Sequence, residues 1–78
     1  MNNKPEQDDD IAADVKQAII KQQIDMYKNT RYQTQLLYRV NKNLGATPDQ
    51  LKQYVDELAR LEQALDFFKA ELDAVSAP

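Results

Sequence analysis

The sequence predicts an all-α protein, in which two long helices fold back on each other as an antiparallel hairpin. Two long segments, residues 6–44 and 49–77, contain no Gly or Pro and are rich in residue types that favour helices, such as Ala, Leu, Lys, Gln and Glu. A short stretch containing Gly45 and Pro48 separates them. Strand-type alternation of apolar and polar residues does not occur in either segment. With 78 residues, the chain has room for one domain.

The link between the two segments carries the signals of a helix end followed by a helix start. Gly45 is expected to take the left-handed conformation that ends the first helix. Thr47 is expected to cap the second helix, with Pro48 at its first position and Gln50 completing a capping box. So short a link makes the two helices antiparallel. The expected boundaries are a first helix over about 9–44, a turn at 45–47 and a second helix over about 48–75, forming one domain (9–75) between disordered tails at 1–8 and 76–78.

The second helical segment carries a complete heptad repeat. One apolar position recurs every seven residues and another follows it by three, which is the pattern of a coiled-coil seam. Phe67 falls outside this repeat, and its ring is a candidate anchor for a partner because large rings contribute most to interface energy. The alternative for Phe67 is a ring covered by a second hairpin. The seam consists of Leu51, Tyr54, Leu58, Leu61, Leu65, Phe68, Leu72 and Val75.

The first helical segment is less regular, with apolar residues near both ends and a polar middle. We interpret two neighbouring rows as its seam, and Ile20, Ile24 and Tyr27 as a second apolar patch beside that seam. Thr30 and Gln33 are interpreted as a polar layer that fixes helix register, with a partner-exchange site or a solvent-facing stretch as alternatives. The two rows are Ile19, Met26, Gln33 and Val40, and Gln23, Thr30, Leu37 and Leu44.

Folding the chain at the turn pairs residues whose numbers sum to about 95. Leu44 should then face Leu51, and Val40 should face Val55. Chains of this size gain only about 3–5 kcal/mol from one core, so we expect a second copy to cover the remaining apolar residues in a four-helix bundle. An amphipathic helix of another protein is the alternative partner. The expected interface residues are Leu51, Tyr54, Leu58, Leu61, Leu65, Phe68 and Leu72 with Ile20, Ile24 and Tyr27.

Charge is divided unevenly along the chain. The net charge is −3 over residues 1–10, +4 over 11–44 and −4 over 45–78. A basic helix beside an acidic one favours their antiparallel pairing. Alternatively, the basic helix could contact the phosphates of a nucleic acid, although a sequence pI near 4.7 weighs against that alternative. The candidate phosphate contacts are Lys21, Lys28, Arg31, Arg39 and Lys42.

The composition argues against catalysis and against a bound cofactor or metal. The chain has no Cys and no His, and its single serine is Ser76, which removes thiolate nucleophiles, imidazole acid–base groups and Cys/His metal sites. No apolar run reaches the ~18–20 residues of a membrane span. We therefore expect a cytoplasmic, non-catalytic protein–protein interaction module, such as a small adaptor, co-chaperone or regulator.

Overall fold

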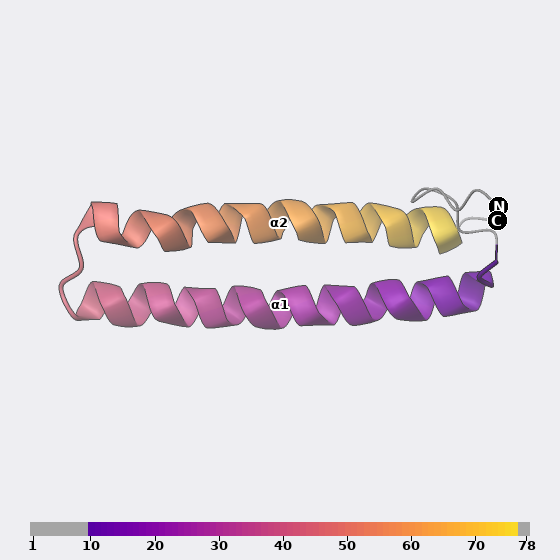
Figure 1. Ribbon diagram of the computed structural model, residues 1–78, viewed down its shortest axis with the longest axis horizontal. Helices are drawn as coiled ribbons and strands as arrows, with labels where there is room; N and C mark the ends of the chain where they lie inside the picture. Colours follow the sequence, from indigo (N-terminus) through magenta and orange to yellow (C-terminus); the bar gives the residue numbers. More distant parts are fainter. Residues whose placement is uncertain (1–9, 77–78) are drawn as a thin grey trace.

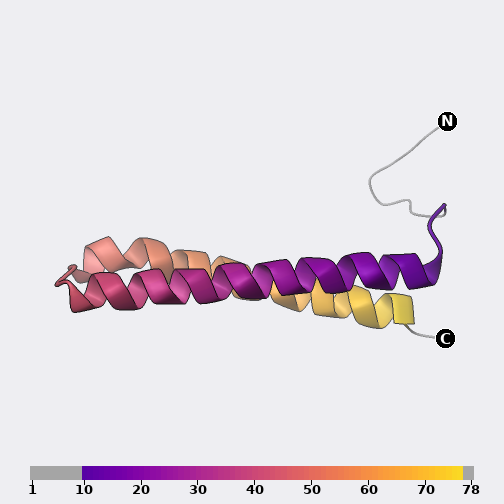
Figure 2. The same cartoon turned by 90° about the horizontal axis from the view of Figure 1, so that it is seen from below.

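The computed structural model describes residues 10–76, which form two helices joined by a tight turn (Figure 1). Helix α1 spans Ala13–Asn43 and helix α2 spans Pro48–Ser76. The helices run antiparallel and side by side, and their axes cross near the middle of their lengths (Figure 2). The all-α hairpin expected from the sequence is confirmed. The tails expected at 1–8 and 77–78 lie outside the described residues, whereas Ser76 belongs to α2.

Helix α1 begins later than the expected position near residue 9. Residues 10–12 form a turn and a bend, and Ala12 is extended, with φ −65° and ψ 151° and no side-chain cap. The first helical hydrogen bond outside the assigned helix runs from the Lys16 N–H to the Ala12 carbonyl, at 3.0 Å. Because α2 ends at Ser76, the first turn of α1 extends past the end of its partner helix.

The turn has the geometry that its residue types predict. Gly45 has a φ of +92°, and its N–H donates to the Lys42 carbonyl, while the Ala46 N–H donates to the Asn41 carbonyl. These two bonds define a Schellman motif. On the other side, the Gln50 N–H donates to Thr47 Oγ1 at 3.2 Å and the Thr47 N–H donates to Gln50 Oε1 at 2.8 Å, which is a reciprocal capping box.

The core is a narrow strip between the two helices. On α2 it follows the expected heptad: Leu51, Leu61 and Leu65 are buried, and Leu61 and Leu65 are 1% and 0% exposed. The other seam positions of α2 are half-buried, namely Tyr54, Leu58, Phe68, Leu72 and Val75.

On α1 the structure corrects the expected seam. The residues that turn toward α2 lie one position after those of the predicted rows. Of these residues, Ile24 and Thr34 are buried. Leu44, expected to pack on Leu51, is 76% exposed, and both Val40 and Val55 are exposed instead of facing each other in the core. The inner row of α1, buried or half-buried, is Gln17, Ile20, Ile24, Tyr27, Arg31, Thr34, Tyr38 and Asn41.

The register itself was predicted correctly. Tyr27 packs edge-to-face on Phe68, with ring centroids 5.1 Å apart, and Asn41 Nδ2 donates to the Tyr54 hydroxyl at 3.3 Å. The residue numbers in both pairs sum to 95. A rotation of α1 by one residue, about 100° around its axis, therefore separates the expected packing from the observed one.

Polar side chains in the strip explain why this face of α1 turns inward. The buried Thr34 hydroxyl donates to the Thr30 carbonyl at 2.9 Å, and Arg31 Nη1 donates to Glu62 Oε1 at 2.6 Å. With α1 rotated to the predicted face, Gln33 would instead lie against the α2 leucines, where an unpaired amide costs about 1–3 kcal/mol. Thr30 and Gln33 are exposed, so the polar middle is a solvent-facing stretch of the hairpin rather than a layer between α1 and α2.

Replacing Gly45 with alanine tests the turn. Beyond Gly45 and its two chain neighbours, no heavy atom lies within 4 Å of the position that a Cβ would take, so only the left-handed backbone conformation opposes the side chain, at about 1–2 kcal/mol. We expect Gly45→Ala to lower the free energy of unfolding by that amount in chemical denaturation. Asn43→Ala, at the end of the same helix, should change it by less than about 0.5 kcal/mol; equal effects of the two substitutions would contradict the turn geometry.

Replacing Leu65 with alanine tests the core. Leu65 is fully buried, and leucine-to-alanine changes at such sites cost about 2–5 kcal/mol. We expect Leu65→Ala to leave the protein largely unfolded at room temperature, as measured by circular dichroism. Val55→Ala, at a 51% exposed position of the same helix, should keep the melting temperature near that of the parent. A Leu65→Ala protein that melts normally would show that the α2 heptad does not form the core.

Candidate functional site

The inner face of α1 uses only some of its apolar residues, and a second set points away from α2. Ile19, Met26, Leu37 and Val40 are each about half exposed, at 45–52%, and Leu44 is 76% exposed. These residues include the apolar members of both rows that the sequence predicted to be the seam. Val15 and Leu36 are also exposed and add to the outer set.

This outer side of α1 is almost free of charge. Residues seven apart lie above one another on a helix of this kind, so α1 can be divided into seven columns. Three neighbouring columns hold the outer apolar residues together with Gln, Asn and Thr, and Lys16 is their single charged residue. We call these columns the uncharged face: Lys16, Gln23, Thr30, Leu37 and Leu44; Ile19, Met26, Gln33 and Val40; and Val15, Gln22, Asn29, Leu36 and Asn43. The remaining charges of α1 lie on three of the other four columns.

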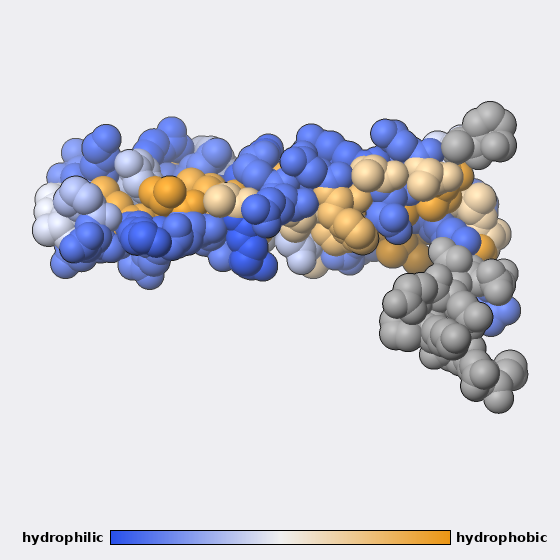
Figure 3. All heavy atoms as spheres, turned by 90° about the horizontal axis from the view of Figure 1, so that it is seen from above, coloured by the Kyte–Doolittle hydropathy of each residue, from blue (hydrophilic) through white to orange (hydrophobic). Residues whose placement is uncertain are grey.

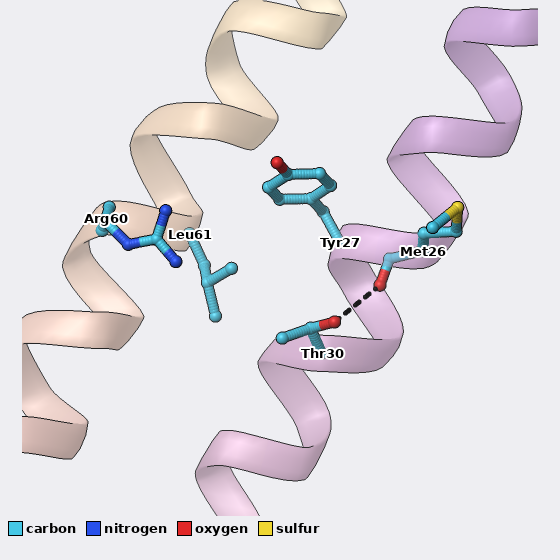
Figure 4. Close-up of a pocket in the computed structure, with 5 residues that line it drawn as sticks. All are labelled: Met26, Tyr27, Thr30, Arg60 and Leu61. Atoms are coloured by element: carbon cyan, nitrogen blue, oxygen red, sulfur yellow. Dashed lines mark hydrogen bonds between the residues drawn. The ribbon is translucent and has the colours of Figure 1, made fainter.

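A hollow of about 270 Å³ opens beside the middle of the uncharged face. Figure 4 shows the Tyr27 ring reaching from α1 toward α2 and Leu61 reaching back, with Met26 directed away from them. The Thr30 hydroxyl donates to the Met26 carbonyl at 3.1 Å, which satisfies it within α1. Arg60 lines the α2 side. The hollow is therefore apolar at its base, with a guanidinium at its edge.

A second hollow of about 200 Å³ lies at the end of the hairpin away from the turn. Four apolar side chains line it: Ile11, which precedes α1, Ile19 and Ile20 from α1, and Val75 from α2. Lys16 and Glu71 complete the lining. Because Ile19 belongs to the uncharged face, this hollow continues that face toward α2. A cavity of about 150 Å³ holds a benzene-sized molecule, so the hollow has room for one aliphatic side chain.

The charged residues near the first hollow are held within α2. Arg60 pairs with Glu57 through two hydrogen bonds, Nε to Oε1 at 2.9 Å and Nη2 to Oε2 at 2.6 Å. The Arg60 hydrogen bond holds the pKa of the Glu57 carboxyl below its usual range, and the same pairing raises the pKa of Arg60. The pair therefore stays ionised at neutral pH. The ionised pair places charge at the rim of the hollow but supplies no group that exchanges a proton near neutral pH.

The structure places the predicted interface residues inside the hairpin. Ile20, Ile24 and Tyr27 belong to the inner row of α1, and the α2 seam lies opposite them, so within one hairpin both sets pack between the two helices. Phe67, the candidate anchor, is 60% exposed and packs edge-to-face on Phe68 with ring centroids 5.6 Å apart. It stays a candidate anchor.

The predicted basic stripe is only partly brought together. Lys21, Lys28 and Lys42 share one exposed column of α1, on the side of the helix away from the uncharged face. Arg31 lies in the strip between the helices and pairs with Glu62. Arg39 lies in the column next to these lysines, and its guanidinium carbon is 6.0 Å from the centroid of the Tyr32 ring. Lys42 Nζ is 5.8 Å from the centroid of the Tyr38 ring.

Other kinds of site find little support in the part of the chain that the structure describes. Within residues 10–76, no group of three or more acidic side chains is placed to hold a metal ion, and neither helix there has an apolar stretch long enough to cross a membrane.

Seen from the side of α2, apolar surface is broad near the termini and narrows to a stripe between hydrophilic borders near the turn (Figure 3).

Sequence reasoning missed the uncharged face because it assigned two of the three columns to the core. The signal was nevertheless present as a charge distribution: seven-residue spacing places one Lys, and no other charge, on three of the seven columns of α1. Comparisons with models of protein families, with curated proteins and with solved structures found no match to this chain. The candidate site therefore rests only on the residues and packing of this hairpin.

Proposed function

We propose that this chain is a non-catalytic protein–protein interaction module that binds through the uncharged face of α1, either as a homo-oligomer or against an amphipathic helix of another protein. The observation that carries the proposal is the set of half-exposed apolar side chains along this face. Depletion of charged residues with retention of apolar ones is the composition of a buried interface core. The depletion of charge extends along nearly the whole length of α1, whereas the apolar side chains gather toward its two ends, with Met26 between them.

The shape of the hairpin supports association. Its radius of gyration is 17.0 Å, whereas a compact domain of this length has about 11.5 Å. Its accessible surface is 6271 Å², against about 4,900 Å² for a compact monomer of this mass. Two helices can bury only one strip between them, so an elongated hairpin leaves more surface in water than a compact domain does.

The proposal includes the cytoplasmic location and the absence of catalysis expected from composition. A chain without Cys fits a reducing compartment. The ionised Glu57–Arg60 pair is a surface ion pair and offers neither a nucleophile nor a general base near pH 7.

Replacing Val40 with glutamate tests the proposed face. A carboxylate buried in an apolar interface would lose its hydration without gaining a partner, so we expect Val40→Glu to abolish association while α-helical content stays unchanged. Val55→Glu is the matched control, because Val55 is equally exposed but lies in the column of Glu62 and Lys69 on the opposite side of the hairpin. Light scattering over a range of protein concentrations measures self-association, and affinity capture from the host measures other partners.

The two variants separate the proposal from a general effect of charge. Loss of association in Val40→Glu alone supports the uncharged face as the binding surface. If both variants associate as the parent does, or if the parent binds neither itself nor any host protein, the proposed function is wrong.

A second candidate function, nucleic-acid binding by a helical-hairpin dimer, is favoured by one observation: Lys21, Lys28 and Lys42 share an exposed column. Lys21 and Lys28 lie about 10 Å apart along the helix and Lys42 lies about 21 Å beyond Lys28, and cations in such a column can follow a phosphate backbone. The pairing of Arg31 with Glu62 and the −4 net charge of residues 45–78 weigh against this function, because the acidic helix would repel a polyanion within one or two Debye lengths.

Reversing two charges distinguishes these functions. We expect the parent protein to bind no RNA or DNA in a mobility-shift assay at 0.15 M salt. The double variant Lys28→Glu/Arg39→Glu should lower the free energy of unfolding by less than about 1 kcal/mol, because it removes only exposed contacts such as that of Arg39 with Tyr32. A shift by the parent that weakens steeply with salt and disappears in the double variant would instead establish the nucleic-acid function.

A further inference from the structure

We propose that a second copy of this chain covers the uncharged face, with the α1 helices of the two copies packed antiparallel. The proposal rests on the interaction function proposed above and names its partner, its surface and its orientation. The pairing places residues whose numbers sum to about 59 opposite each other, so that the twofold axis passes near Asn29 and Thr30.

The area of the face suits a dimer of this kind. From Val15 to Leu44 the face is about 44 Å long at 1.5 Å per residue. Three of seven columns on a cylinder of about 10–12 Å diameter present roughly 650 Å². Two copies would therefore bury about 1,300 Å² in total, within the usual range of stable protein interfaces.

The distribution of charge selects α1, rather than α2, as the partner surface. The outward columns of α2 carry charged residues along their length, among them Asp56, Glu57 and Arg60. Packing α1 of one copy on these columns of another would remove those charges from water. A second α1 presents the same uncharged face, so the contact satisfies the requirement of a twofold axis that each surface complements itself.

The orientation follows from two features at opposite ends of α1. Leu44, the most exposed of the large apolar side chains in the described residues, lies beside the turn. The hollow lined by Ile11, Ile19, Ile20 and Val75 lies at the far end of the hairpin. Only an antiparallel copy brings the two together: a sum of about 59 places Leu44 of one copy level with residue 15 of the other, within one helical turn of Ile19.

The rest of the face fits the same orientation. Ile19 of one copy lies level with Val40 of the other, and Met26 lies level with Gln33. The uncharged amides and hydroxyls near Asn29 and Thr30 fall at the twofold axis, where a polar layer fixes the register of packed helices. A parallel dimer would bring the two Lys16 side chains level with each other, whereas the antiparallel one separates them by most of the length of α1.

Cysteine cross-linking tests the orientation directly, because the natural chain has no Cys. Ile19→Cys and Val40→Cys are made as separate proteins, mixed, and treated with a short bismaleimide. We expect the mixture to give covalent dimers at least tenfold faster than either variant alone, because only position 19 of one copy and position 40 of the other are level. Gln63→Cys, at an exposed position of α2, is the control and should not cross-link.

Self-association measured without any cross-linker gives an independent test of the dimer. Leu44→Ala should raise the dissociation constant of the dimer about tenfold or more in analytical ultracentrifugation, since the leucine loses its buried contact with the hollow. Val55→Ala should leave that constant unchanged. Loss of affinity in Leu44→Ala, together with cross-linking only in the mixture, supports the antiparallel dimer.

Each contrary result identifies what has failed. Cross-linking of Ile19→Cys alone overturns the antiparallel orientation, and cross-linking through Gln63→Cys overturns the choice of face. A parent chain that stays monomeric at high micromolar concentration overturns the dimer. In that last case, capture of a host protein by the parent but not by Val40→Glu would leave the interaction function standing, and no capture at all would remove both proposals.

Discussion

Burial of the α2 leucines determines most of this structure. Leu61 and Leu65 are removed from water almost completely, and they supply much of the hydrophobic free energy that a two-helix protein can gain. Because α2 has an apolar residue at every seam position, it requires one complete face of α1. The face that α1 supplies includes Ile20, Ile24 and Tyr27, and this choice decides which apolar residues of α1 stay exposed.

The choice leaves α1 with a second apolar set and no helix in the hairpin to cover it. Apolar surface on two sides of one helix is typical of bundles of more than two helices, and the interaction proposed above is based on this pattern. The uncharged face adds a more specific feature, because its polar residues are nearly all amides and hydroxyls, which can be buried if they find partners, whereas charged groups are costly to bury. The composition of this face therefore suits contact with protein better than contact with water.

Polar groups within the strip determine how the helices meet. The Asn41–Tyr54 hydrogen bond and the Arg31–Glu62 pair join α1 to α2 near the turn and near mid-length. Thr34 is satisfied within its own helix, and no buried side-chain nitrogen or oxygen in the described residues lacks a hydrogen-bond partner. A rotation of α1 would break these contacts and bring Gln33 against leucine, so polar contacts favour the inner row even though the outer rows carry more aliphatic side chains.

Local sequence signals by themselves determined the two helices, the turn and the register in which the helices pair. Gly45, Thr47 and Gln50 act through hydrogen bonds to residues at most five positions away, and the α2 heptad is complete, so none of these features depended on distant parts of the chain. The face of α1 that turns inward was decided only by the tertiary structure. Ile19 and Ile20 are adjacent, and hydrophobicity alone gives either row a reason to be buried. The deciding contacts, Tyr27 with Phe68, Arg31 with Glu62 and Asn41 with Tyr54, form between residues that come together only when the helices pack.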